Sequence, residues 1–347
     1  MRHLLFASEL YALPILRPIA AAARERGDDL RWFVSSHIAR FLQADEQRLI
    51  DGCAVREWHP DSVISASNWV PHFFPGLKVQ VFHGFNVDKR SESRGHFRIR
   101  GLFDLYCTQG PATTAPFQAM QRALGHFRVI ETGWSKLDPM FNASLPASVQ
   151  AAAHGRNIVG YASTFTASLS SAPLLYQTIA AQIARGDRYW LLTLHPKSAP
   201  IWQDRYRALA GPNAQYVEAD QLAHMLAGAQ VLVSDTSSVV SEFAVIGKAV
   251  VTFRNRAPKP YMIDINDADE LDAALQSAFA DDAAQRLAAA RIGDAIHPYR
   301  DGRSSERVLD AIRCVLEDRS VATRRKPASL ARRLKIRWRL RDFSRAV

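Results

Sequence analysis

The sequence predicts an α/β protein of two doubly wound parallel-sheet domains that face a cleft, followed by a basic C-terminal tail. Three observations carry this prediction. The chain has 347 residues, 48% of them hydrophobic, whereas a single core usually stops growing at roughly 250–300 residues. Short apolar segments alternate with helix-like segments in two consecutive series, as in parallel sheets covered by helices. The excess of positive charge lies almost entirely in residues 321–347.

The first series spans residues 1–145 and begins as strand, helix, strand. The apolar segment His3–Ala7 is followed by a helix-like stretch from Ile15 to Arg26, which Gly27 ends, and by a second apolar segment, Leu30–Val34. The alternation continues, so these residues are expected to form one domain. Its further elements are a helix at Ala115–Leu124 and strands at Lys78–Phe82, Leu105–Cys107 and Val129–Glu131.

The second series spans residues 146–320. The pattern weakens between Pro139 and Gly155, so the connection between the domains is expected there. In a sheet of this kind, ligands bind at the carboxyl ends of the strands. Expected strands are Asn157–Ala162, Tyr189–Leu194, Gln215–Val217, Val231–Val233 and Ala249–Phe253, and expected helices are Leu174–Arg185, Trp202–Leu209, Ala219–Ala227 and Ser238–Ile246.

Composition and motifs disfavour several functional classes. Cys53, Cys107 and Cys314 are odd in number and widely spaced, which predicts neither a disulfide framework nor a zinc site, and no metal or cofactor is expected. No signal peptide opens the chain, and no apolar run approaches the ~18 residues of a membrane span. A cytoplasmic protein, soluble or peripheral at the inner face of the cell membrane, is therefore expected. The chain lacks a G-x-G-x-x-G turn after its first strand and a Walker A loop, which disfavours dinucleotide and P-loop chemistry.

Residues 321–347 form a tail with eight Arg and two Lys against one Asp, a charge of +9 out of a total of +10. Basic and aromatic residues together favour an anionic membrane surface. A solvated tail and an RNA-binding tail are the alternatives, but the near-neutral body predicts no broad phosphate-tracking surface, so no nucleic-acid partner is expected. In helical spacing the apolar residues divide into two faces, Leu330, Leu334 and Trp338 on one and Ile336, Leu340 and Phe343 on the other.

The most informative stretch joins an expected strand to an expected helix. The apolar segment Val231–Val233 runs into the polar run Ser234–Ser238, where the next helix begins. A helix N-terminus offers unpaired N–H groups and a partial positive charge, and hydroxyl side chains add donors. The pattern predicts a diphosphate site, with Glu242 one turn further along, where it could accept hydrogen bonds from ribose hydroxyls. The alternative is an ordinary N-cap, with Glu242 a surface or capping carboxylate.

Two histidines stand at the ends of expected strands, one in each domain. His195 follows the strand Tyr189–Leu194, and His83 follows Lys78–Phe82 and precedes Gly84, which allows close approach of backbone or substrate. An imidazole with an ordinary pKa near ~6.5 can bind a phosphate or exchange a proton with a substrate. A purely structural histidine is the alternative for each, and the parallel placement in both domains favours a function.

Three further segments fit either a polar cleft or an ordinary turn and helix cap. Each begins where an expected strand or loop ends. They are Tyr161–Thr166 after the first strand of the second domain, Thr132–Asp138 after the last strand of the first domain, and Asp301–Arg307 before a C-terminal helix.

Taken in order, these motifs resemble those of the CDP-glycerol glycerophosphotransferase family, which includes the teichoic acid primases and polymerases. Each motif is short, and the resemblance lies in six of them following one another in the family's order over about residues 75–315. The segments are His83–Gly84 for His-Gly-Thr, Gly133–Asp138 for Gly-x-Pro-Arg-x-Asp, Tyr161–Thr164 for Tyr-Ala-Pro-Thr, His195–Pro196 for His-Pro, Ser234–Ser238 for Ser-Asp-Tyr-Ser-Ser, and Asp301–Arg307 for Asp-Gly-x-Ala-Ser-x-Arg.

The resemblance implies a GT-B fold of two Rossmann-like domains. It also implies metal-independent transfer of glycerol phosphate, or a related polyol phosphate, from CDP-glycerol or a similar CDP-polyol to a hydroxyl of a lipid-linked or envelope glycan, with release of CMP. His83 would be the general base, from the acceptor-side domain, and His195 would bind the donor diphosphate and stabilise the leaving CMP.

The remaining residues of the motifs receive roles from the same resemblance. Glu242 would hold the ribose of the donor. The other expected donor-binding residues are Thr164, Ser234, Asp235, Thr236, Ser237 and Ser238. The expected acceptor or cleft residues are Gly84, Ser135, Lys136 and Asp138, and the closing motif supplies Asp301, Ser305 and Arg307.

Departures from the family pattern at Phe85, Ser135, Lys136 and Thr236 leave the donor polyol open. Because the chain is shorter than the teichoic acid polymerases, a single addition is expected rather than polymerisation. A nucleotide-sugar glycosyltransferase or a UDP-sugar 2-epimerase of the same fold is the enzymatic alternative, which the donor would distinguish. A membrane- or nucleic-acid-binding protein acting through its basic tail is the non-enzymatic alternative.

Overall fold

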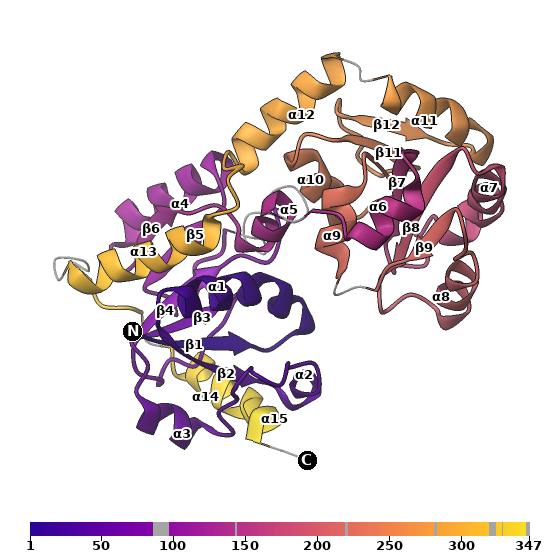
Figure 1. Cartoon of the computed structure of the whole chain (residues 1–347). Coiled ribbons are helices and arrows are strands. Elements are labelled where there is room, and N and C mark those ends of the chain that lie inside the picture. The colour runs from indigo at the N-terminus through magenta and orange to yellow at the C-terminus, as the bar shows by residue number, and fades with distance from the viewer. Residues whose placement is uncertain are drawn as a thin grey trace. The chain divides into compact units, whose positions relative to one another are not determined.

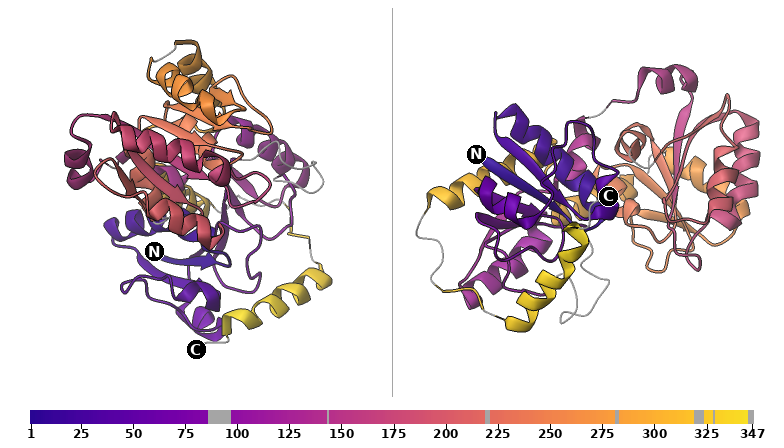
Figure 2. Two further views of the ribbon diagram at one scale, coloured as in Figure 1. Left: turned by 90° about the vertical axis from the view of Figure 1, so that its right-hand side faces the viewer. Right: turned by 90° about the horizontal axis from the view of Figure 1, so that it is seen from below.

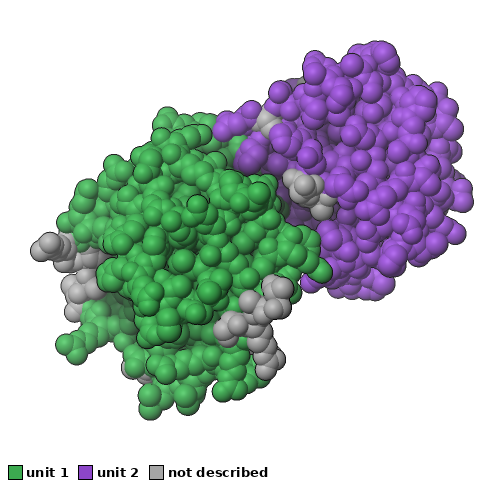
Figure 3. Space-filling model, turned by 60° about the horizontal axis from the view of Figure 1, so that its bottom comes forward, with its two compact units in different colours: residues 1–138, 296–347 green, residues 139–295 purple. Residues whose placement is uncertain are grey.

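The computed structural model describes residues 1–85, 97–142, 144–218, 221–280, 283–318, 324–327 and 329–344. The chain divides into two compact units, which Figure 3 colours separately. Unit 1 combines Met1–Asp138 with Ile296–Val347, and unit 2 is Pro139–Ala295. The sequence-based boundaries, after residues 145 and 320, differ from these units chiefly because residues 296–318 join unit 1; residue 320 itself lies outside the described residues.

Unit 1 is built on a six-stranded parallel sheet with the strand order β2-β1-β3-β4-β5-β6. The five strands expected from the sequence are confirmed, and β3 is an addition. The hydrophobic pattern does not reveal β3 because it has four residues, two of them serine. Since β1 pairs with both β2 and β3, the sheet grows from β1 in one direction and then in the other. The strands are β1 (Arg2–Ala7), β2 (Asp29–Val34), β3 (Ser62–Ser65), β4 (Leu77–Val81), β5 (Leu105–Thr108) and β6 (Arg128–Glu131).

Helices cover both faces of this sheet (Figures 1 and 2). Helix α1 (Leu13–Glu25) has proline in its first turn, and the chain leaves it at Gly27, whose φ of 73° suits glycine. Helix α13 (Ser304–Glu317) packs against α1 through an apolar face that includes Val308 and Ile312, which is why it belongs to unit 1. The other helices are η1 (Leu10–Ala12), α2 (Ser36–Ala39), α3 (Gly52–Trp58), α4 (Pro111–Leu124), η2 (Ser135–Leu137), α14 (Leu330–Arg339) and α15 (Arg341–Ser344).

The described part of the tail belongs to the core of unit 1. Ile336 on α14 and Phe343 on α15 are 3% and 2% exposed and pack into the same apolar cluster as the sheet residues. The Phe343 ring stacks on Phe6 and Phe33, with centroid separations of 5.4 and 5.1 Å. The expectation of a separate tail is therefore corrected: its apolar residues cover aromatic side chains that the sheet would otherwise expose.

The opposite face of α14 points outward. Leu330, Leu334 and Trp338 are 77%, 67% and 66% exposed, and basic residues lie between them along the helix. The division of the tail into two apolar faces is thus confirmed. Among the described residues, no helix combines the length and apolarity that crossing a bilayer requires.

Unit 2 is built on a second six-stranded parallel sheet, with the order β12-β11-β10-β7-β8-β9. Here too the five expected strands are confirmed. The chain runs from β7 outward to β9 and then returns to β10 on the other side of β7. The strands are β7 (Asn157–Ser163), β8 (Arg188–Leu194), β9 (Ala214–Tyr216), β10 (Val231–Ser234), β11 (Ala249–Phe253) and β12 (Met262–Ile265).

The helices of unit 2 follow the predicted alternation. The expected helices near residues 174–185, 202–209 and 238–246 are confirmed, while the expected start of another at Ala219 lies outside the described residues. The stretch expected to connect the domains folds largely as helix. The helices are α5 (Asp138–Asn142), α6 (Ala147–Ala153), α7 (Ala172–Arg185), α8 (Pro200–Arg207), α9 (Leu222–Gly228), α10 (Ser238–Val245), η4 (Ala268–Glu270), α11 (Leu271–Phe279) and α12 (Ala283–Ile296).

The two faces of the tail predict opposite responses to mutation. Phe343→Ala removes a ring buried among Phe6 and Phe33, and we expect it to lower the free energy of unfolding by about 3–5 kcal/mol. Trp338→Ala changes an exposed side chain, so its free energy of unfolding should stay within about 0.5 kcal/mol of the wild-type value. Urea unfolding followed by circular dichroism measures both. Equal stability of the two variants would show that the tail does not contribute to the core.

Candidate functional site

In unit 2 the sequence-predicted donor residues gather at the carboxyl ends of neighbouring strands. Thr164 follows β7, His195 follows β8, and Ser234–Ser238 closes β10 and opens α10. Since β7 lies between β8 and β10, these three segments emerge side by side along one edge of the sheet. The direction of sheet growth reverses between β7 and β10, which is where ligands bind in open α/β sheets.

Asp235 joins the loops at this edge. Its carboxylate is 0% exposed and accepts hydrogen bonds from Ser163 Oγ at 2.7 Å, Thr164 N at 3.0 Å and Ser171 N at 2.9 Å. Ser234 is also fully buried, and its hydroxyl donates to the Ala162 carbonyl at 2.6 Å. These two residues therefore hold the loop after β7 against the end of β10, and their side chains bond protein atoms.

The other residues of the run form the start of α10. Ser237 is its N-cap, with a side chain that accepts from Val239 N, and Ser238, the first helical residue, is exposed. Thr236 Oγ1 accepts from Arg256 N at 3.1 Å, which ties this turn to the loop after β11. An accessible helix N-terminus with hydroxyl side chains suits an anion such as a diphosphate.

The loop after β11 adds groups that the sequence analysis did not single out. Asn255 Nδ2 donates to the Asp235 carbonyl at 3.0 Å, and Arg254 and Arg256 on either side of it are exposed. Arg254 has a φ of 49°, which is uncommon outside glycine, and its Nε donates to the Asn266 carbonyl. The sequence could have indicated these arginines, because they follow directly after the expected strand Ala249–Phe253. Since β11 lies next to β10, the loop brings positive charge to the same edge of the sheet.

Glu242 is buried rather than at the surface. It lies on the inner side of α10 and is 2% exposed. The alternative that made it a surface carboxylate is therefore wrong. Its assignment to a ribose stays a prediction, which requires the nucleotide to reach a carboxylate below the protein surface.

His195 is held in one neutral form. Its Nδ1 accepts a hydrogen bond from Lys197 N at 3.0 Å, so Nδ1 carries the lone pair and the proton of the neutral ring lies on Nε2. Burial lowers the pKa of His195, and the Lys197 charge lowers it further. The ring lies 4.5 Å from that of Phe165, which is 45% exposed. Near neutral pH this exposed histidine therefore presents an N–H donor at Nε2.

His83 in unit 1 is held in the opposite form. It follows β4, and its Nδ1 donates to the Ala66 carbonyl at 3.2 Å, so the lone pair of the neutral ring lies on Nε2. The Tyr11 ring lies 5.0 Å away at an interplanar angle of 32°. Gly84 accepts from Gln109 Nε2 at 3.1 Å through its carbonyl, and no described atom lies within 4 Å of where a Cβ would stand. His83 thus presents a proton acceptor beside an uncrowded backbone.

Two expected acceptor residues are instead buried in unit 1. Ser135 is 1% exposed and its hydroxyl donates to the Ile15 carbonyl. Asp138 accepts from Ser304 N at 2.9 Å, Ser305 N at 2.7 Å and Ser305 Oγ at 2.6 Å, so it caps the N-terminus of α13. Burial raises the pKa of Asp138, and these hydrogen bonds oppose the shift. Their side chains therefore fix the turn after β6 rather than face a ligand.

The closing motif belongs to the same structural unit. Ser305 is the partner of Asp138, and Arg307 pairs with Asp301 while its guanidinium lies 4.1 Å from the Tyr299 ring centre. Lys136 Nζ lies 5.2 Å from the Trp134 ring centre. Two motifs that are far apart in the sequence therefore form one local arrangement.

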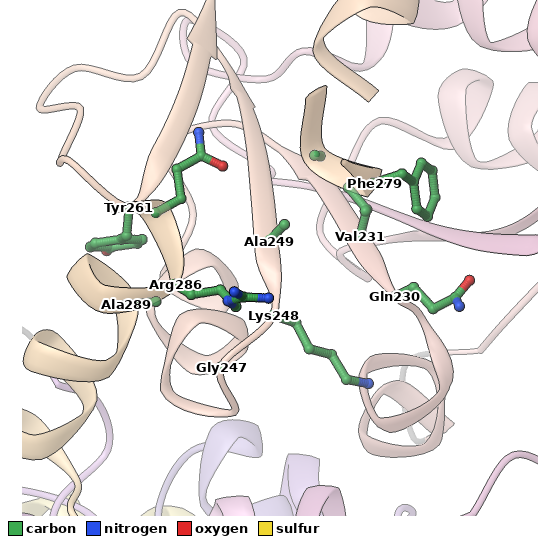
Figure 4. A pocket seen from close by; sticks show the side chains of 11 residues that line it. Gln230, Val231, Gly247, Lys248, Ala249, Tyr261, Phe279, Arg286 and Ala289 are labelled. Atoms are coloured by element: carbon green, nitrogen blue, oxygen red, sulfur yellow. The ribbon is translucent and has the colours of Figure 1, made fainter. Parts of the chain in front are cut away.

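A cavity of about 300 Å³ lies at the other end of the unit 2 sheet, and Figure 4 shows the side chains that line it. It is lined by residues at the starts of β10 and β11, among them Gln230, Lys248 and Ala249, and by Tyr261 and Arg286. Burial lowers the pKa of Lys248 to about 8, and its Nζ donates to the carbonyls of α9 and of the residue that follows it. Because it lies at the amino ends of the strands, this cavity is separate from the candidate donor residues.

Comparison with known proteins gives a family and a fold. Residues 104–313 match the sequence model of CDP-glycerol:poly(glycerophosphate) glycerophosphotransferases. A search among curated proteins finds no match. The fold is similar to that of a putative UDP-N-acetylglucosamine 2-epimerase from Listeria monocytogenes, with a TM-score of 0.64 at 12% identity over 91% of this chain and 96% of that one.

Two further solved structures are similar. The wall teichoic acid polymerase TagF has a TM-score of 0.62 at 13% identity, over 91% of this chain and 89% of that one. A UDP-GlcNAc 2-epimerase from Neisseria meningitidis, bound to UDP-GlcNAc, has a TM-score of 0.60 at 9% identity, over 92% and 100%. At such identities the likeness shows the fold alone, which is the GT-B-like architecture of two parallel sheets. The family match includes His195 and Ser234–Ser238 but begins after His83.

The contacts of His195 predict how its titration responds to one charge. Lys197→Gln removes the positive charge that disfavours the imidazolium but keeps the backbone N–H bonded to Nδ1. We expect the pKa of His195 to rise and the Nε2–H form to persist in the neutral state. NMR titration of the ring signals measures both, with Lys136→Gln in unit 1 as the control. An unchanged pKa in Lys197→Gln would contradict the assignment of this charge.

Proposed function

Because the chain belongs to the CDP-glycerol:poly(glycerophosphate) glycerophosphotransferase family, we propose that it transfers glycerol phosphate from CDP-glycerol, or a related polyol phosphate from a similar CDP-polyol, to a hydroxyl of a cell-envelope glycan. CMP is the other product. The observation that carries this proposal is the pair of strand-end histidines: the one in unit 2 presents a proton at Nε2 and the one in unit 1 presents a lone pair there.

On the donor side, the diphosphate would bind at the start of α10. Ser237 and Ser238 would supply donors together with the helix N-terminus, and the neutral His195 would donate from Nε2. Arg254 and Arg256 would add positive charge. As the bond to CMP breaks, negative charge grows on the leaving phosphate, and these donors would stabilise it.

On the acceptor side, His83 would act as general base. The acceptor oxygen would attack the phosphorus of the glycerol phosphate group, the bond from that phosphorus to the CMP oxygen would break, and the acceptor proton would pass to His83 Nε2. Because Nδ1 donates to the Ala66 carbonyl, the imidazolium formed in this step keeps a hydrogen bond that stabilises it.

The test is CMP release with CDP-glycerol, CDP-ribitol and UDP-sugars offered in parallel, each with and without envelope glycan. We expect CMP from a CDP-polyol when acceptor is present. His83→Gln, which keeps a polar side chain without a titratable base, should lower turnover by about 100-fold or more with the KM for the donor little changed.

Three outcomes would contradict the proposal. Release of UDP would identify a nucleotide-sugar glycosyltransferase, and conversion of a UDP-sugar without acceptor would identify an epimerase. Full turnover by folded His83→Gln would remove His83 from the mechanism.

Peripheral attachment to an anionic membrane is the second part of the proposal, and the outer face of α14 supports it. Leu330, Leu334 and Trp338 form an exposed apolar stripe one turn apart, among the basic residues Arg333, Lys335, Arg337 and Arg339. Each cation near an anionic surface contributes about 1 kcal/mol. A lipid-linked acceptor would make this attachment useful, because it brings the acceptor hydroxyl to the enzyme.

The membrane contact is tested with substitutions on the outer face, because removing the tail would also remove Ile336 and Phe343 from the core. We expect Leu330→Ser, Leu334→Ser and Trp338→Ser together to reduce binding to phosphatidylglycerol vesicles at least tenfold, since each apolar side chain that enters a membrane contributes about 1.5–3 kcal/mol. Vesicle co-sedimentation measures the bound fraction. Leu174→Ser, an exposed leucine of unit 2, is the control. Undiminished binding of the triple variant would place the contact elsewhere.

A further inference from the structure

We propose that Tyr11 positions the imidazole of His83 and offers its exposed ring as the platform on which an uncharged sugar or polyol unit of the acceptor binds. The inference rests on the proposed role of His83. It concerns a segment that precedes the family match at residues 104–313, so the match assigns nothing to it.

The first step is the position of Tyr11 in the fold. It belongs to η1, which follows β1 directly, and His83 follows β4. The sheet of unit 1 reverses its direction of growth between β1 and β3. Tyr11 therefore lies where two consecutive connections diverge, the place where open α/β sheets bind ligands.

The second step is the way in which Tyr11 is held. Ser8 at the end of β1 and Ser67 after β3 are 7% and 2% exposed, and their hydroxyls lie 2.8 Å apart in a hydrogen bond. The Ser67 hydroxyl also interacts with that of Tyr11. The buried Ser67, itself bonded to Ser8, thus helps to hold the aromatic side chain at the reversal point.

The third step is the restraint on His83. The Ala66 carbonyl fixes its Nδ1, and the Tyr11 ring lies against the imidazole at 5.0 Å. The loop after β3 carries both Ala66 and Ser67, so the same loop fixes the proton of His83 and the hydroxyl of Tyr11. A hydrogen bond sets the tautomer, and the aromatic contact limits rotation of the ring.

The fourth step is the chemistry of the exposed surface. Tyr11 is 41% exposed and the neighbouring Leu10 is 38% exposed, so an apolar surface adjoins an exposed strand-end histidine. The Ser67 hydroxyl that interacts with Tyr11 is neutral. An aromatic face with hydroxyls near its edge suits a ligand with C–H groups on one side and hydroxyls on the other, which is the character of a sugar or polyol.

The experiment compares Tyr11→Phe, which keeps the ring, with Tyr11→Leu, which removes it. CDP-glycerol is the donor, and glycerol and methyl glucoside are the acceptor probes. We expect Tyr11→Leu to lower kcat/KM for the acceptor by about 10- to 100-fold, because small displacements of a reacting group are costly. The KM for CDP-glycerol should change less than about twofold, and Tyr11→Phe should retain most of the activity. Phe41→Leu, at a similarly exposed aromatic of unit 1, is the control.

A second measurement does not depend on turnover. ¹⁵N NMR of the imidazole reports which nitrogen carries the proton, and we expect the Nδ1–H form of His83 in the wild type and in Tyr11→Phe, with a mixture of forms in Tyr11→Leu. Unchanged tautomer and unchanged acceptor kinetics in Tyr11→Leu would overturn the inference. If the wild type releases no CMP from either CDP-glycerol or CDP-ribitol with envelope glycan present, the proposed function fails, and the NMR comparison alone then decides whether Tyr11 positions His83.

Discussion

Both units depend on one constraint of parallel sheets. All strands end at the same edge, and the direction in which the sheet grows reverses once, between β1 and β3 in unit 1 and between β7 and β10 in unit 2. At a reversal the two loops diverge, so the polar groups between them are not covered by a crossing connection. Tyr11 and Ser67 at the first reversal, and Thr164 and Ser237 at the second, owe their positions to this topology rather than to their neighbours in the sequence.

Buried carboxylates keep the loops at these edges in place. Asp235 accepts from the loop after β7, and Asp138 accepts from the first residues of α13. An unpartnered carboxylate at either position would cost several kcal/mol, but each accepts at least three hydrogen bonds, which offset the loss of water. These two acids therefore join distant segments of the chain, while the exposed side chains at the edge of unit 2 include Ser238 and His195.

Sequence patterns were sufficient for the fold and for the gathering of the candidate donor residues at one sheet edge, but not for the direction in which side chains point. Ten strands are visible as apolar segments, whereas the four-residue strands β3, with two serines, and β12, with an aspartate, carry too little pattern. Serines and acids at a strand end look alike whether they face solvent or the core, so Ser135 and Asp138 could not be told from ligand-binding residues. The sequence did not reveal the role of Phe343 either, because the aromatic side chains that it covers come from the first two strands, about three hundred residues earlier in the chain.

The two histidines show how the loop around an imidazole determines which of its nitrogens carries the proton. A neutral imidazole has one ring proton, so whatever bonds Nδ1 determines what Nε2 can do. In unit 1 a carbonyl holds the proton on Nδ1, and in unit 2 a backbone N–H meets the lone pair there. Two residues of one type, each placed just after a strand of a similar sheet, can therefore serve opposite halves of the proposed transfer, one removing a proton from the attacking oxygen and the other donating to the leaving phosphate.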